Sequence, residues 1–189
     1  MFPVLLFGVG CASAGEVAQT SDSGVKVDTP VEGPSEVVDS AEPVSTEPVV
    51  VFVNELMPAN DGAVEVDGET PDWVELYNPG DEDVSLEGFT ITDDLDEPGK
   101  ALLGVDLVLP AGGFLVLYAS GSDAGGAHLP FKLSGDGEAV GLFFPSGEPA
   151  DRVTFGAVPD NLALARDADG DADWVVTATP TPGAANEVD

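Results

Sequence analysis

Short segments in which apolar and polar residues alternate fill most of this chain from residue 51 to residue 186. Alternation with a period of two places successive side chains on opposite faces of a strand, so each segment predicts a β-strand with one buried face. Turn-forming Gly, Pro, Asn and Asp residues separate the segments at short spacing, and no clear amphipathic helical pattern interrupts them. This pattern predicts an all-β fold of the sandwich type.

The expected strands are residues 50–57, 72–78, 84–93, 105–109, 114–119, 131–133, 139–144, 152–155, 163–166 and 174–177. Gly88 lies inside the third of them and predicts a bulge or bend there. The alternation then assigns a shared core to Val74, Leu76, Leu86, Phe89 and Ile91.

Four phrases in this region resemble one known family. They are VNEL at 53–56, DWVELYNPG at 72–80, GFTITDD at 88–94 and LPAGGFLVLY at 109–118. In this order they resemble the lamin tail domain in its bacterial and archaeal form, and the closing PTPGAAN at 180–186 is also frequent in those members. The resemblance implies an immunoglobulin-like β-sandwich that acts as a binding or scaffolding module rather than as a catalyst.

The charge of the chain excludes one class of partner. Asp+Glu 36 against Lys+Arg 5 gives a formal net charge of −31. Nucleic-acid affinity rests on Lys and Arg that displace counterions from phosphates, and this sequence has no basic patch. We therefore expect no nucleic-acid partner. The acidity fits a secreted protein in a saline or calcium-containing medium, or a protein from a halophile; the simpler interpretation is a well-solvated surface with no special role.

Cys11 is the only cysteine, so an intramolecular disulfide is excluded. An apolar run ending in Gly8-Val9-Gly10 precedes it, and this arrangement resembles a prokaryotic lipoprotein signal. We therefore expect residues 1–10 to be a signal peptide, Cys11 to be lipidated, and the protein to be anchored outside the cytoplasm through lipid alone. The alternative is plain secretion, with Cys11 present by chance. No later stretch of sequence is long and apolar enough to span a bilayer.

Residues 11–48 differ sharply from the rest of the chain. Ser, Thr, Pro, Glu, Asp and Val dominate them, and aromatic residues are missing. Isolated valines bury too little area to offset the entropy of ordering such a segment, so the composition predicts a disordered, extended linker. The folded domain is then expected over residues 49–189.

Alternating carboxylates at residues 167–173 form the sharpest chemical motif. The side chains of Asp167, Asp169, Asp171 and Asp173 surround Gly170, and several oxygens in a flexible loop are what Ca²⁺ requires. The loop lacks the downstream Glu of an EF-hand, and a solvated hairpin turn before Trp174 is the alternative. The carboxylates at 93, 94 and 96 have the same two interpretations. Calcium is the only cofactor that the sequence suggests.

Two glutamates within the family phrases, Glu55 and Glu75, are expected to be neighbours across the sheet. A pair of carboxylates can act as an acid and base couple. Here we expect them instead to bind backbone amides or hold a loop between strands. Trp73 and Tyr77 share the face of Glu75, where they either pack or line a ligand groove.

Catalysis has little support in the sequence. The only histidine, His128, has no nucleophile motif beside it, and Ser120 lacks the strand–elbow–helix context of a hydrolase. The sequence therefore predicts a non-enzymatic envelope lipoprotein that binds an envelope protein or polysaccharide at the cell surface. The alternatives are a calcium-stabilised module of a surface assembly and an accessory domain that works in trans with a secreted hydrolase.

Overall fold

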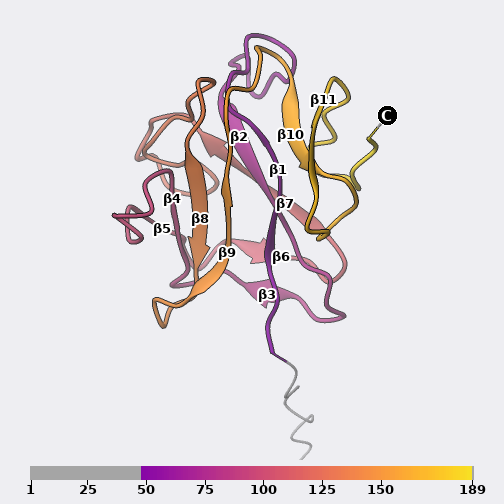
Figure 1. Ribbon diagram of the computed structural model, residues 1–189. Helices are drawn as coiled ribbons and strands as arrows, with labels where there is room; N and C mark the ends of the chain where they lie inside the picture. Colours follow the sequence, from indigo (N-terminus) through magenta and orange to yellow (C-terminus); the bar gives the residue numbers. More distant parts are fainter. Residues whose placement is uncertain (1–47, 189) are drawn as a thin grey trace, which may run out of the picture. The chain divides into compact units, whose positions relative to one another are not determined.

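The computed structural model describes residues 48–188 (Figure 1). The expected signal peptide, Cys11 and the acidic linker up to residue 47 lie outside the described residues. Between residues 48 and 188 there is no helix that has the length and apolarity needed to cross a membrane. This part of the chain folds into antiparallel sheets, which confirms the all-β prediction.

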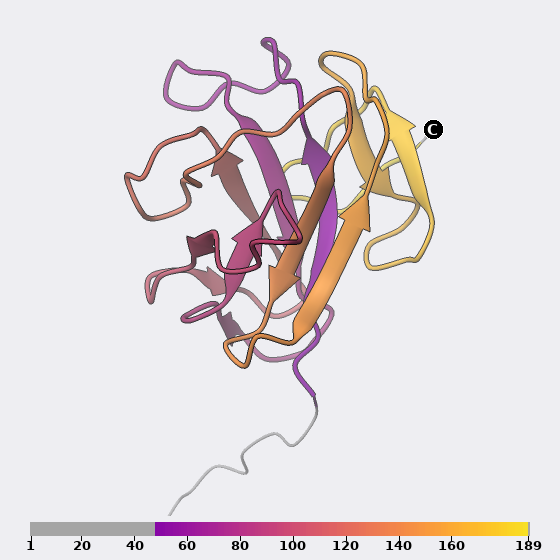
Figure 2. The same ribbon diagram turned by 60° about the vertical axis from the view of Figure 1, so that its left-hand side comes forward.

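Two main sheets pack face to face (Figures 1 and 2). The larger has the strand order β11-β10-β1-β2-β7, made of Trp174–Thr177, Ala163–Arg166, Phe52–Met57, Asp72–Tyr77 and Phe114–Ala119. The smaller has the order β5-β4-β8-β9, made of Ala101–Leu102, Thr90–Thr92, Ala139–Phe143 and Pro149–Thr154. A short ribbon joins β3 (Val84–Ser85) to β6 (Val108–Leu109).

The strand predictions fail where the chain changes direction. The expected strand 84–93 is divided into β3 and β4, because Gly88 between them adopts a φ of 81° that side-chain-bearing residues rarely take. Residues 131–133 form no strand, although Phe131 and Leu133 are both buried. Their alternation reflects insertion into the core from a crossing loop. The strand β5 was not predicted, because its two residues are too few to show an alternating pattern.

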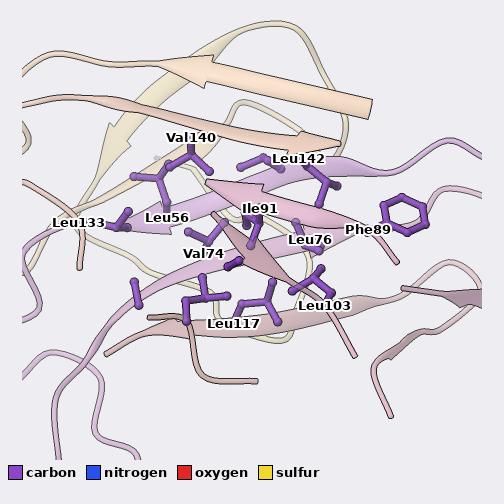
Figure 3. Close-up of a cluster of buried hydrophobic side chains, with 14 of the residues drawn as sticks. Leu56, Val74, Leu76, Phe89, Ile91, Leu103, Leu117, Leu133, Val140 and Leu142 are labelled. Atoms are coloured by element: carbon purple, nitrogen blue, oxygen red, sulfur yellow. The ribbon is translucent and has the colours of Figure 1, made fainter. Parts of the chain in front are cut away.

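The core lies between the two main sheets (Figure 3). Val74, Leu76 and Leu117 from the larger sheet meet Ile91 and Leu142 from the smaller one, and all five are fully buried. The predicted core set is thereby confirmed, since Leu86 and Phe89 belong to the same cluster. Burial of each Leu or Phe is worth about 1.5–3 kcal/mol.

A β-bulge in β1 explains how one strand contributes both apolar residues to the core and polar residues to the outer face. The register shifts between Val53, which pairs with Leu76, and Glu55, which pairs with Glu75. Asn54 is the extra residue, so the inward-facing series Val51, Val53 and Leu56 resumes one position late. Asn54 and Glu55 therefore both lie on the outer face of the larger sheet.

Arg166 at the end of β10 closes one edge of the sandwich. Its Nε donates to the Val53 carbonyl at 2.7 Å, and its Nη2 pairs with Asp151 of β9 at 2.7 Å. The guanidinium also lies 4.6 Å from the Trp174 ring and donates from Nη1 to the Asp171 carbonyl. A buried cation with this many partners links the two main sheets and fixes the start of the Asp-rich loop.

Candidate functional site

The outer face of the larger sheet carries a buried pair of carboxylates. Glu55 and Glu75 stand opposite each other in the β1–β2 register, and neither is exposed to solvent. Two ionised carboxylates buried side by side repel each other, so such a pair requires donors or protons. The surrounding hydrogen bonds decide what the pair can do.

The C-terminal segment supplies the donors. Thr181 donates its backbone N–H and its hydroxyl to Glu55 Oε2, each at 3.0 Å. Gly183 donates its backbone N–H to Glu75 Oε2 at 2.6 Å. We call residues 181–186 the clasp, because they hold the end of the chain against the sheet. The expectation that these glutamates bind backbone amides is confirmed.

Asn54, placed by the bulge, connects the clasp to the Asp-rich loop. Its amide nitrogen donates to Glu75 Oε1 at 3.1 Å and to Asp169 Oδ1 at 3.0 Å. Its amide oxygen accepts the Gly170 N–H at 3.1 Å. Asn186 adds its own N–H to Asp169 Oδ1 at 2.9 Å. The VNEL and PTPGAAN phrases are thus parts of a single polar cluster.

Burial dominates the electrostatics of this cluster. Desolvation raises the pKa of Glu55 from 4.5 to about 7, against the lowering effect of its bonds to Thr181. Desolvation likewise raises the pKa of Glu75 to about 8, with repulsion from Glu55 and Asp169 adding to it. The pair therefore retains protons near neutral pH. Because its oxygens are occupied by the clasp, the pair is built to hold structure.

The Asp-rich loop is a hairpin turn in this structure. Asp167 donates its N–H to the Asp173 carbonyl at 2.9 Å, which closes the turn before β11. Asp169 faces the clasp, while Asp167, Asp171 and Asp173 are exposed. Among the described residues no group of three or more His, Cys, Asp or Glu side chains is arranged to hold a metal ion. Calcium binding by Asp167, Asp169, Asp171 and Asp173 stays a prediction.

The second carboxylate group has structural roles. Asp93 forms an ion pair with Lys100, and Asp94 accepts the Asp96 N–H at 3.0 Å within a turn. Trp73 packs with Met57 and Ala163 in a smaller cluster on the outer face. The Tyr77 ring stacks on Phe114 at 5.0 Å. The aromatic residues beside Glu75 are therefore packing residues.

Ser120 and His128 come together, which the sequence did not predict. Ser120 Oγ lies 3.1 Å from His128 Nδ1, in an exposed pair beside a polar pocket that contains Asp72 and Lys132. Asp72 is already engaged, since it accepts N–H bonds from Asn60 and Leu133. Within residues 48–188 no carboxylate hydrogen-bonds to this imidazole, so the pair lacks the third member that orients the base in a hydrolase.

An open groove of about 460 Å³ lies at the opposite end of β1 from the 58–71 loop. Phe89 and Phe144 form part of its lining, and their rings are 5.3 Å apart. Val49 and Val50 line one side and are 49% and 43% exposed. These residues come from segments that are distant in the sequence, so periodicity gave no sign of the groove.

Acidic side chains form another wall of this groove. Asp81, Glu82 and Asp83 follow the turn at Pro79-Gly80, and all three are exposed. In the described part of the chain no lysine or arginine lines the groove. An apolar surface beside a cluster of negative charge is therefore open to solvent here.

Comparison with known proteins agrees with the four sequence phrases. The model of the Lamin Tail Domain family matches residues 45–157, which include β1 to β9 and the groove. No curated protein matches the chain. The matched family is an immunoglobulin-like structural domain rather than a catalytic one. The family match and the antiparallel sandwich together show that this chain belongs to the lamin tail domain family.

Proposed function

We propose that this protein is a non-catalytic binding module of the cell envelope that contacts an envelope protein through the groove lined by Val50 and Phe144. The observation that carries the proposal is the groove itself. Two valines that are nearly half exposed adjoin the partly buried Phe144 and the edge of the core at Phe89. The other exposed large apolar side chains of the described residues do not line this groove; they are Leu102, Val105, Val108 and Val176. Exposed apolar surface with a polar rim is typical of protein-binding sites.

The polar sites support a binding role rather than a catalytic one. The buried carboxylates of Glu55 and Glu75 are engaged by the clasp and by Asn54, so an acid and base couple has no free oxygen to present to a substrate. The Ser120–His128 pair is exposed and lacks an orienting carboxylate within the described residues. Accelerated chemistry requires preorganised groups that contact the substrate in a water-excluded site. The carboxylate pair is buried beneath its hydrogen-bond donors, and the Ser120–His128 pair is exposed to water.

Anchoring forms the second part of the proposal. Lipid on Cys11 attaches the chain to the membrane, and the acidic segment of residues 11–48 connects this anchor to the domain. Growth of the native organism with an alkyne-tagged fatty acid should label the wild-type protein and should leave Cys11→Ser unlabelled. An unlabelled wild type that is found in the medium would instead support plain secretion.

Site-specific photo-crosslinking in intact cells tests the binding role. A photoreactive amino acid at Val50 should give a discrete crosslinked product with an envelope component. The matched control is Val176 on β11, which is 49% exposed and does not line the groove. A product from Val50 and none from Val176 supports the proposal. Identical crosslinking from the two positions, or none from Val50, would exclude the groove as a binding site.

A further inference from the structure

The groove has chemistry that specifies a class of partner, provided that the proposed binding function holds. Its apolar part is formed by Val49, Val50, Val84, Phe89 and Phe144, together with Pro145. Pro145 packs closely over Gly88, since a Cβ at Gly88 would lie 3.3 Å from the Pro145 ring. An apolar surface of this kind favours an apolar anchor on the partner.

The charged part adds a second requirement. Asp81, Glu82 and Asp83 lie beside the apolar part, and the chain as a whole carries a net charge of −31. Anionic partners are repelled by this surface, whereas a cationic group next to an apolar one gains from both parts of the groove.

The uncharged polar side chains of the groove, Asn78 and Ser85, are engaged within the protein. The Asn78 amide donates to the carbonyls of Glu82, Leu109 and Pro110, and its oxygen accepts the Gly80 N–H at 2.9 Å. Asp83 accepts the Ala111 N–H at 2.9 Å. A carbohydrate needs many free donors and acceptors, and this groove offers few. A polypeptide, which presents apolar and basic side chains together, matches it better.

Charge also argues against occupants from the chain itself. Residues 12–47 are rich in Glu and Asp and carry Lys26 as their single basic side chain. A second copy of the chain brings a further charge of −31. We therefore propose that the groove binds a polypeptide segment of a different protein, in which an apolar side chain is adjacent to Lys or Arg.

Short blocked peptides test this inference against the full-length protein by fluorescence anisotropy. The first peptide has a Leu-Phe pair flanked by lysines. A second has glutamates in place of the lysines, and a third has serines in place of Leu-Phe. We expect binding of the first alone, and we expect that binding to weaken as salt is added, because rim charges are screened.

Two triple variants separate the groove from the general charge of the protein. Neutralising the rim with Asp81→Asn, Glu82→Gln and Asp83→Asn should weaken binding of the lysine peptide about tenfold. The control removes three exposed charges of the 58–71 loop, with Glu65→Gln, Asp67→Asn and Glu69→Gln, and should change binding less than about twofold.

The apolar part of the groove is tested by a double variant. Val49→Ser with Val50→Ser should weaken binding about tenfold as well, through the apolar contact. Unchanged melting temperatures will show that each variant is folded.

The outcomes also distinguish this inference from the function on which it rests. Equal weakening by both triple variants, or equal binding of the lysine and glutamate peptides, would overturn the basic and apolar specificity. If Val50 still crosslinks in cells, binding through the groove then stands with a partner of other chemistry. A crosslinked product that is resistant to protease and sensitive to glycosidases would replace the polypeptide with a glycan. Absence of crosslinking at Val50 removes the function itself.

Discussion

The two faces of the larger sheet are both buried at β1 and β2, yet they are held by different interactions. The inner face presents Val74 and Leu76 to an apolar core, where every contact is interchangeable with another of similar shape. The outer face presents Glu55 and Glu75 to the clasp, where each oxygen has a particular donor. The inner face therefore supplies the apolar part of the stability, whereas the outer face fixes where the end of the chain lies and makes stability depend on pH.

The bulge at Asn54 allows a single strand to supply both faces. Without the extra residue, strict alternation after Val53 would turn Glu55 into the apolar core and Leu56 outward. An unpaired carboxylate in that core would cost several kcal/mol. With the bulge, Glu55 meets Thr181 and Leu56 stays in the core. The comparison between the faces therefore depends on a local irregularity of the backbone.

The largest expected effect comes from the inner face. Leu76→Ala should lower the free energy of unfolding by about 2–5 kcal/mol, because it removes buried methyl groups and leaves a cavity. The matched control is Leu102→Ala on β5, where the side chain is 73% exposed, and its cost should stay within about 0.5 kcal/mol. Urea unfolding measures both. Equal losses for the two leucines would contradict the assignment of the core.

The contribution of the outer face to the free energy of unfolding should depend on pH. The folded state raises the pKa of Glu55 from 4.5 to about 7 and that of Glu75 to about 8, so it retains protons that the unfolded chain releases. This stabilisation is complete below about pH 4.5 and is lost as pH rises through 7 and 8. The free energy of unfolding should therefore fall between these limits, by up to about 1.4 kcal/mol per pH unit for each carboxyl.

Glu75→Gln sharpens that test. The amide keeps the shape of the carboxyl and removes its titration, so stability should depend less on pH than in the wild type. Glu55 still titrates in this variant, and burial also raises the pKa values of Asp72 and Glu138, so these three groups leave a residual slope of the same sign. Glu87→Gln, at an exposed position, is the control and should leave the slope unchanged. A wild-type stability that increases from pH 5 to pH 8 would show that the clasp binds ionised carboxylates.

The sequence predicted features that depend on the alternation of neighbouring residues. It missed contacts between residues that are far apart in the chain. Alternation identified Val74 and Leu76 as core residues, because burial of one strand face is visible along the chain. The polar pair Asn54-Glu55 between Val53 and Leu56 was a visible break in that alternation. The C-terminal partner of Glu55 was hidden, since Glu55 and Thr181 are 126 residues apart and nothing local joins them.

The groove was hidden for a related reason. Val50 and Phe144 look like ordinary strand residues in the sequence, and their exposure depends on which segments the fold brings beside them. Phe131 and Leu133 illustrate the opposite error, since their alternation predicted a strand where a loop inserts into the core. An alternating pattern shows only that apolar residues occur at regular intervals along the chain. Tertiary packing then determines what covers each of their side chains.

The smallest expected effect concerns the Asp-rich loop, where the clasp meets solvent. Calcium at this loop would use carboxylates of Asp167, Asp169, Asp171 and Asp173 with a main-chain carbonyl, and it would have to compete with the donors that Asp169 already accepts. Extracellular loops of this kind bind with a Kd of about 10⁻⁴–10⁻³ M. At 1 mM calcium the native state should then gain about 0.4–1.4 kcal/mol by mass action, which is visible as a rise in melting temperature. Asp169→Asn with Asp171→Asn should remove most of this rise, whereas Glu65→Gln with Glu69→Gln, which removes the same charge at exposed positions outside both Asp-rich groups, should preserve it. Equal calcium shifts in the two double variants would assign the effect to screening of the net charge of −31, and the loop would then be a solvated turn that serves only the clasp.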